Sequence, residues 1–181
     1  YGNRPEDTFQ IESENVVLKP IGMQHAEVIF REFTPDITTY MYPKAAEDIS
    51  EITAFIQKSR ETNEAESNLQ IVILDRQTGD FLGCGGVHDL LKPEPELGIW
   101  IRKGAHGHGY GREAVSALIH WAAENLPCSS LVYPVDRRNW ASRRIPESHG
   151  GIIVREFRET GAGGQDLDLV EYRVDLAQYR R

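Results

Sequence analysis

A glycine-rich segment between a predicted strand and a predicted helix carries the clearest chemical signal in this sequence. Residues 102–112 read RKGAHGHGYGR, so four glycines fall within eight positions. The first backbone N–H groups of a helix have no intrahelical partner, and the helix dipole is positive at that end. Glycines let these amides converge without Cβ clashes, which predicts a pocket for a phosphate or pyrophosphate. Lys103, Arg112 and the His106 ring could add positive charge around it.

Three other interpretations of this segment compete with that prediction. The simplest is a flexible loop that precedes an ordinarily capped helix. A Walker-type loop is excluded, because Gly111 is followed by Arg-Glu instead of Lys-Ser or Lys-Thr. A dinucleotide-binding oxidoreductase is a remote alternative, since Gly109, Gly111 and Ala114 fit G-x-G-x-x-A and Asp136 could bind a ribose. Too few residues follow Asp136 for the further βα units that such a fold needs.

Hydrophobic periodicity predicts the elements that position the glycine-rich segment. Strands are expected at 11–21, 69–74, 81–89, 96–102, 129–135, 151–158 and 168–175, and helices at 23–33, 47–62, 110–125 and 139–149. On the helix over 110–125, His120 and Trp121 lie off the apolar stripe and are expected to be partly exposed. The order of elements indicates one α/β domain over 1–181, with a mixed sheet and a flexible segment at 1–10.

Composition narrows the class of protein. Hydrophobic residues make up 40% and charged residues 27% of the 181 residues, as in globular proteins. The formal net charge of −8 argues against nucleic-acid binding and is compatible with a cationic substrate. Cys84 and Cys128 are too few for a disulfide framework and are expected to be reduced, in the cytoplasm. No apolar run approaches the ~20 residues of a membrane span, and His106 and His108 lack the further ligands of a metal site.

Two motifs at the expected separation make the chain resemble the GNAT superfamily of acetyl-CoA-dependent N-acetyltransferases. The family's pyrophosphate loop, Arg/Gln-x-x-Gly-x-Gly/Ala, matches His106-Gly107-His108-Gly109-Tyr110-Gly111, with His106 in place of the leading Arg or Gln. A second motif, Asn-x-x-Ser, matches Asn139-Trp140-Ala141-Ser142. The strands at 11–21 and 97–101 are also similar. The chain most resembles the branch that acetylates the N-termini of ribosomal proteins.

This resemblance implies a fold and a set of cofactor-binding residues. The central sheet is mostly antiparallel and flanked by helices, and its strands at 96–102 and 129–135 splay apart around the pantetheine arm of acetyl-CoA. The backbone of Ile99, Trp100 and Ile101 would bind that arm, as would Asn139, and Ser142 would lie near the sulfur. The diphosphate would be held by His106, Gly107, His108, Gly109, Tyr110, Gly111 and Arg112.

The reaction requires a base, since an alkylammonium with a pKa of around 10 is not a nucleophile. Glu96 is the preferred candidate, because it begins the strand beside the thioester and points away from Leu97 and Ile99. Glu94 lies in a proline-rich turn and is a poorer candidate. His88 could act near neutral pH, although a single histidine at a strand end is more often structural.

Two hydroxyl groups are the candidates for the proton donor. Many relatives have a tyrosine seven residues after the motif asparagine, where this chain has Pro146, which carries no proton and is expected to distort its helix. Ser142 could donate a hydrogen bond to the leaving sulfur, and Tyr133 is a further donor.

The resemblance thus predicts an N-acetyltransferase that moves an acetyl group to a primary amine by direct attack in a ternary complex. The acceptor could be a protein N-terminus, a polyamine, an amino acid or an aminoglycoside. Its identity should depend on the loop at 34–46, the first two helices and the connection at 159–167. A non-catalytic acyl-CoA sensor or scaffold is the alternative. A homodimer is compatible with the sequence.

Overall fold

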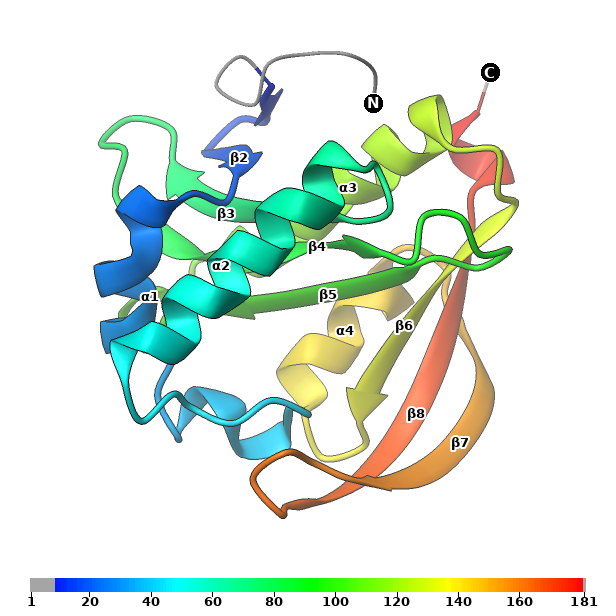
Figure 1. Cartoon of the computed structure of the whole chain (residues 1–181). Helices are drawn as coiled ribbons and strands as arrows, with labels where there is room; N and C mark the ends of the chain where they lie inside the picture. The colour runs from blue at the N-terminus through cyan, green and yellow to red at the C-terminus, as the bar shows by residue number, and fades with distance from the viewer. Residues whose placement is uncertain (1–8, 181) are drawn as a thin grey trace.

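The computed structural model describes residues 9–180, which form an eight-stranded sheet with helices on both faces (Figure 1). The strand order is β1-β2-β3-β4-β5-β6-β8-β7, and every neighbouring pair except β5 and β6 is antiparallel. The strands are β1 (Ile11–Glu12), β2 (Val16–Pro20), β3 (Leu69–Asp75), β4 (Phe81–His88), β5 (Glu96–Ile101), β6 (Ser130–Asp136), β7 (Ile152–Thr160) and β8 (Asp166–Asp175). The predicted mixed, mostly antiparallel sheet is confirmed.

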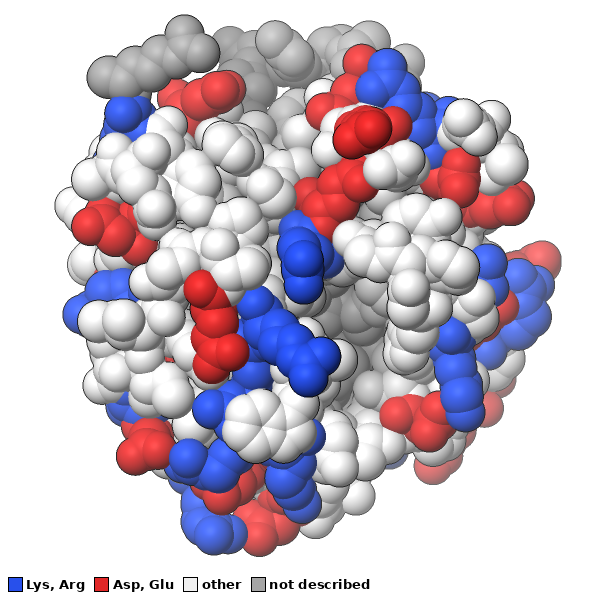
Figure 2. Space-filling model, turned by 180° about the vertical axis from the view of Figure 1, so that it is seen from behind, with Lys and Arg blue, Asp and Glu red and all other residues white. Residues whose placement is uncertain are grey.

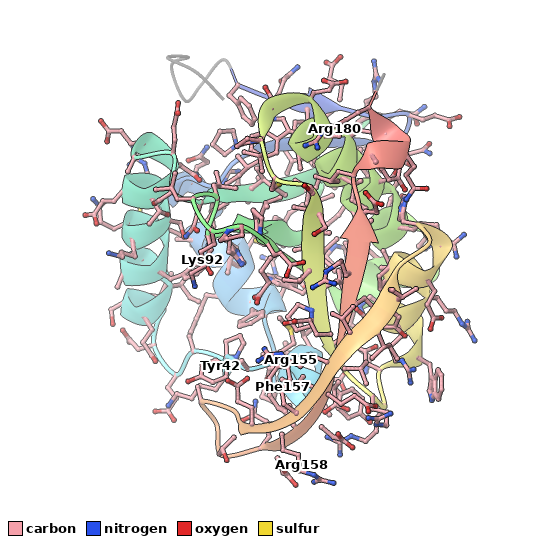
Figure 3. The ribbon with its side chains drawn as sticks, turned by 90° about the vertical axis from the view of Figure 1, so that its right-hand side faces the viewer. Tyr42, Lys92, Arg155, Phe157, Arg158 and Arg180 are labelled. Atoms are coloured by element: carbon pink, nitrogen blue, oxygen red, sulfur yellow. The ribbon has the colours of Figure 1, made fainter. Side chains whose placement is uncertain are left out.

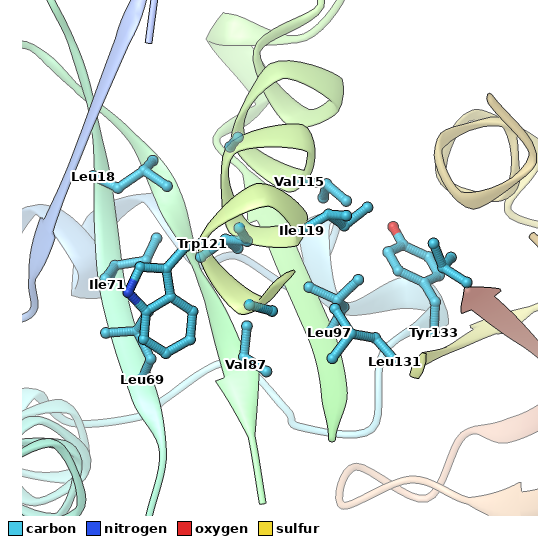
Figure 4. Close-up of a cluster of buried hydrophobic side chains, with 14 of the residues drawn as sticks. Leu18, Leu69, Ile71, Val87, Leu97, Val115, Ile119, Trp121, Leu131 and Tyr133 are labelled. Carbon is cyan, nitrogen blue, oxygen red and sulfur yellow. The ribbon is translucent and has the colours of Figure 1, made fainter. Parts of the chain in front are cut away.

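The helices divide between the two faces of this sheet. They are α1 (Ala26–Glu32), α2 (Ile49–Glu64), α3 (Tyr110–Asn125) and α4 (Trp140–Ser148), with short 3₁₀ turns η1 (Met23–His25), η2 (Ile37–Tyr40), η3 (Lys103–Ala105) and η4 (Ala177–Tyr179). One buried cluster joins α1 and α2 to Val72 and Cys84. The larger cluster joins α3 to Leu18, Ile71 and Leu97 on the opposite face (Figure 4).

Two sequence-based expectations are wrong. Residues 11–21 do not form one strand, because Ser13–Asn15 turn the chain so that β1 pairs with β2. The carboxylate of Glu113 in α3 stabilises this turn by accepting hydrogen bonds from the N–H groups of Asn15 and Val16 at 2.7 and 3.2 Å. Trp121 is buried, because its ring packs toward Leu69 and Val87 (Figure 4), whereas His120 is exposed as expected.

The contact between β5 and β6 is the feature of the fold that creates a site. Among the described residues, a single register pair, Glu96 with Val132, joins these parallel strands, and the Val132 N–H donates to the Pro95 carbonyl at 2.9 Å. Beyond this point the strands diverge (Figure 1). The predicted splayed strands are therefore confirmed.

Other expectations concern the chain as a whole. Cys84 and Cys128 are free and buried. Within residues 9–180, no helix has the length and apolar character to cross a membrane. The flexible segment predicted at 1–10 lies mostly outside the described residues, which begin at Phe9.

Candidate active site

The gap between β5 and β6 opens into a cavity of about 710 Å³ that reaches both faces of the sheet. Glu96, Trp100 and side chains of α1 and α2 line it on one face, and Tyr133, Asn139 and Ser142 line it on the other. Figure 2 views the molecule from the α3 side, where the surface is hollowed near its centre and Lys and Arg side chains lie beside the hollow. The sheet is thus open at the place where the resemblance puts an acyl carrier.

The open edge of β5 offers backbone amides to this gap. The Arg102 N–H donates to the Leu82 carbonyl of the β4 side at 2.8 Å. Because backbone direction alternates along a strand, Trp100 directs its N–H at β4 as well, whereas Ile99 and Ile101 direct theirs at the gap. Of the three strand residues predicted to bind pantetheine, only Ile99 and Ile101 therefore present N–H groups to it.

The glycine-rich segment forms a cradle of amides at the start of α3. The segment makes one 3₁₀ turn, η3, and then Gly107 and Gly109 adopt left-handed φ angles of +84° and +77°. A Cβ at either glycine would meet nothing within 4 Å, so the side of the cradle facing these positions is open. The first N–H groups of α3 are available to an anion in this space, as a diphosphate requires.

The basic side chains of this region take different directions. The His106 Nε2 donates to the Ile101 carbonyl at 2.7 Å, so the ring lies back on β5. Lys103 pairs with Asp36 at 2.9 Å. Arg143, on α4, is buried and donates to the Tyr172 hydroxyl at 3.1 Å. The backbone amides are therefore the main donors of the cradle, with the exposed Arg112 beside them.

The Asn-x-x-Ser motif opens α4 and brings two hydroxyls together. The Asn139 side chain caps α4 by accepting from the Ser142 N–H at 3.3 Å. The Ser142 Oγ lies 2.7 Å from the Tyr133 hydroxyl, and either group can be the donor. Burial raises the pKa of Tyr133 to about 12, so this phenol keeps its proton at neutral pH. Both residues were predicted from the sequence as candidate donors, but their contact was not.

Glu96 lies at the narrow end of the gap, on the face covered by α1 and α2. Burial raises the pKa of its carboxyl group, and the negative charges of Asp89, Glu171 and Glu159 raise it further. A carboxylate with a raised pKa is a stronger base than an ordinary glutamate. Glu94, by contrast, is held by Arg173 and Ser130 outside the cavity, which lowers its pKa.

His88 lies directly opposite Glu96 on β4 and also lines the cavity. Its Nε2 lies 3.1 Å from the Gln70 Oε1, which only accepts, so Nε2 carries the proton and Nδ1 has the lone pair. A Cβ at Gly98 would lie 3.2 Å from the His88 Cε1, so this glycine leaves room for the ring. Burial lowers the pKa of His88, which keeps the ring neutral. Sequence analysis did not identify Gln70 and Gly98 as part of the site. Only knowledge of the strand register could have indicated them.

Pro146 lies within α4, which continues through it to Ser148. No proton donor replaces it there, and Tyr133 reaches the same hydroxyl from β6 instead. Asp136, the candidate ribose ligand of the oxidoreductase alternative, is fully buried and accepts from Arg138 at 2.8 Å. The largely antiparallel sheet is also incompatible with that alternative, which is wrong.

Comparison with known proteins agrees with this arrangement. The family model of the acetyltransferase (GNAT) domain matches residues 15–152. This chain belongs to the GNAT acetyltransferase family. It is an N-acetyltransferase that uses acetyl-CoA, and the open amide cradle and the unpaired edge of β5 fit that cosubstrate.

Individual relatives are similar over most of the chain. The N-acetyltransferase YoaA of Bacillus subtilis (strain 168), itself described as uncharacterized, is 26% identical over 138 residues, which are 75% of this chain and 78% of YoaA. Spermidine N-acetyltransferase from Vibrio cholerae, solved with CoA and spermine, has a TM-score of 0.78 and 15% identity, with 91% of this chain and 98% of that chain covered. The ribosomal-protein-S5-alanine acetyltransferase from Vibrio fischeri has a TM-score of 0.78 and 17% identity, with 96% and 100% covered. The expected likeness to ribosomal-protein acetyltransferases is confirmed at the level of the fold.

Proposed function

We propose that this N-acetyltransferase joins its two substrates through the gap in the sheet, with the amine and the base on the α1–α2 face and the thiol and its proton donor on the α3–α4 face. One observation carries the proposal: Glu96 lines the cavity from the first face, and the Tyr133–Ser142 pair lines it from the second. Groups on opposite faces can serve two substrates at once, which suits direct transfer in a ternary complex.

The residues that would hold acetyl-CoA follow from the open hydrogen-bonding groups. The amides of Gly107 to Arg112 would bind the diphosphate, and those of Ile99 and Ile101 would bind the pantetheine arm. Asn139 follows β6, caps α4 and lines the same cavity. When bound, acetyl-CoA supplies an activated acetyl group as a thioester.

Glu96 would take the first proton. The acceptor enters as an ammonium ion, and the Glu96 carboxylate removes one proton to give a nucleophilic amine. His88 carries its lone pair on Nδ1 and could pass this proton on, since the two residues are cross-strand neighbours. The negative charge that develops on the acetyl oxygen would be stabilised by amides of β5.

Tyr133 and Ser142 would deliver a proton to the leaving group. A C–N bond forms as the C–S bond breaks, the nitrogen loses its second proton, and the thiolate gains one from the hydrogen-bonded hydroxyls. The balance is one acetylated amine, one free thiol and one proton released for each ammonium ion consumed.

Thiol release from acetyl-CoA in the presence of primary amines tests this proposal against the sensor alternative. We expect amine-dependent thiol release in wild type. We also expect a loss of kcat by about 10²-fold in Tyr133→Phe, with an unchanged KM for acetyl-CoA, because proton transfer is affected and binding is not. Tight CoA binding without turnover on any amine would support a sensor instead.

An amine acceptor is required by the family's reaction. The cytoplasmic location and the homodimer remain predictions, of which the first is supported by two free cysteines.

A further inference from the structure

We infer that the acceptor is a small primary amine that carries one apolar group of about the size of an aromatic ring and no carboxylate. This inference rests on the proposed function and specifies its substrate. It concerns the part of the cavity on the α1–α2 face, between Glu96 and the segment that follows η2.

A strap closes this part of the cavity at the end away from α3. The strap consists of residues 41–44 and the β7–β8 turn at 161–165, two segments far apart in the sequence. The Ala162 N–H donates to the Tyr42 carbonyl at 2.7 Å, and the Gln165 Nε2 donates to the Met41 carbonyl at 2.6 Å. A peptide lying along the cleft would have to displace these contacts, whereas a small amine would not.

The walls beneath the strap are apolar and largely aromatic. The lining side chains include Phe33, Met41, Tyr42, Phe55, Trp100 and Phe157. Phe33 and Trp100 pack at 4.8 Å between ring centroids. Figure 3 shows Tyr42 close to the hairpin of β7 and β8, to which Phe157 belongs. Phe55 and Tyr42 remain 47% and 55% exposed, so a bound apolar group would cover surface that is now in water.

The charge of the cavity favours a cation, because four glutamates line it against two basic residues, Lys44 and Arg155. Glu96, Glu159 and Glu171 line it from three different strands. Glu159 and Glu171 lie close enough to Glu96 for their negative charges to raise its pKa. Arg155 pairs with Glu171 at 3.3 Å and covers the Phe157 ring. Within the described residues, neither Glu96 nor Glu159 has an ion-pair partner within 4.0 Å. The net negative charge of the lining therefore attracts an ammonium group and disfavours the carboxylate of a free amino acid.

The test measures kcat/KM for thiol release with five acceptors at saturating acetyl-CoA. These are 2-phenylethylamine, ethylamine, phenylalanine, spermidine and a hexapeptide with an N-terminal serine. We expect 2-phenylethylamine to exceed ethylamine by about 10- to 100-fold, as burial of an aromatic ring predicts. It should exceed phenylalanine and the peptide by at least as much.

A matched pair of variants locates the site. Glu159→Gln should raise the KM for 2-phenylethylamine about 10-fold and leave the KM for acetyl-CoA unchanged, because only ammonium binding is weakened. Glu156→Gln, earlier on the same strand and paired with Arg137 outside the cavity, should leave both values unchanged.

Each other outcome has a defined meaning. Preference for the peptide, for spermidine or for phenylalanine would overturn the inferred substrate class and leave the acetyltransferase proposal standing. Equal effects of the two glutamate variants would overturn the placement of the acceptor. No amine-dependent thiol release with any acceptor would overturn the proposed function itself.

Discussion

Glu96 combines two features that oppose stability and favour catalysis. Its carboxyl group is buried, and three neighbouring carboxylates repel its charge, so its pKa is raised. Glu94, two residues earlier, lies in the opposite environment, because a hydrogen bond from Arg173 lowers its pKa. The contrast supports the proposal that Glu96 is the base and that Glu94 is structural.

Replacement of Glu96 should lower activity and raise stability. Glu96→Gln is expected to reduce kcat by about 10²- to 10⁴-fold, because the base is lost. The folded protein binds more protons than the unfolded chain between the ordinary pKa of glutamate and the raised value, so wild-type stability falls as pH rises through this window. Glu96→Gln lacks this pH-dependent loss of stability, so its Tm should exceed that of wild type at pH 8 but not at pH 4.

Glu94→Gln is the control for both measurements. Because its folded pKa is lowered, Glu94 contributes stability above the ordinary pKa of glutamate, and the variant should be less stable at pH 8 with nearly full activity. A Glu96→Gln enzyme that keeps its activity, or that loses stability at pH 8, would contradict the role assigned to Glu96.

The residue types of the site were predictable from the sequence, but their partners were not. Glu96 and Ser142 followed from a strand pattern and a motif. The contact of Ser142 with Tyr133 depends on how α4 packs on β6, and the contact of His88 with Gln70 depends on the register of β3 and β4. Register and packing are set by the whole sheet, so a linear pattern does not contain them.

At the scale of elements, α3 and its glycine-rich approach form one unit. Gly109 is the N-cap residue of α3 and has a left-handed φ of +77°, which an L side chain adopts at a cost of about 1–2 kcal/mol. A methyl group there would enter the open space that the diphosphate is proposed to occupy. Strain and ligand exclusion therefore act at the same position, and a control must separate them.

Gly79 supplies that control, because it lies in the β3–β4 turn with a φ of +78°, and a Cβ added there would meet no atom within 4 Å. Both Gly109→Ala and Gly79→Ala should lower Tm by a similar few degrees through strain. Only Gly109→Ala should raise the KM for acetyl-CoA, by about 10-fold or more, as a lost phosphate contact implies. If both variants have the wild-type KM, the amides of α3 do not bind the diphosphate.

The boundaries of α3 were predicted correctly, and those of the first strand were not. The range 110–125 is marked by Gly109 before it and Pro127 after it, which are local signals. The break at 13–15 is stabilised by Glu113, about one hundred residues away, and the burial of Trp121 depends on β3 and β4. Local patterns fail where a distant contact decides the conformation.

At the scale of the whole molecule, the sheet consists of two parts joined weakly at their centre. Strands β1 to β5 form one part and β6, β8 and β7 form the other, and within residues 9–180 one register pair joins them. The sequence indicated this division only through its resemblance to a family, because no local pattern distinguishes a splayed pair from a closed one. The strap of 41–44 and 161–165, which connects the two parts at the far end, was not predicted.

A ligand in the gap should form hydrogen bonds only with the backbone amides on the edge of β5 that faces β6. Amides that face the gap, at Ile99 and Ile101, should exchange hydrogen rapidly in the free protein, whereas Trp100 and Arg102 should be protected by β4. Saturation with CoA should slow exchange at Ile99 and Ile101 by at least about tenfold beyond any change at Trp100 and Arg102.

This alternation separates local pairing from general stabilisation. Binding of any ligand stabilises the folded state by mass action, by about 2.7 kcal/mol at 100 times its Kd, and thereby slows exchange at every amide that opens by global unfolding. Such an effect does not alternate along a strand. Uniform slowing from Ile99 to Arg102 would mean that CoA binds without pairing to β5, and the gap would then be a feature of the fold without a role in holding the pantetheine arm.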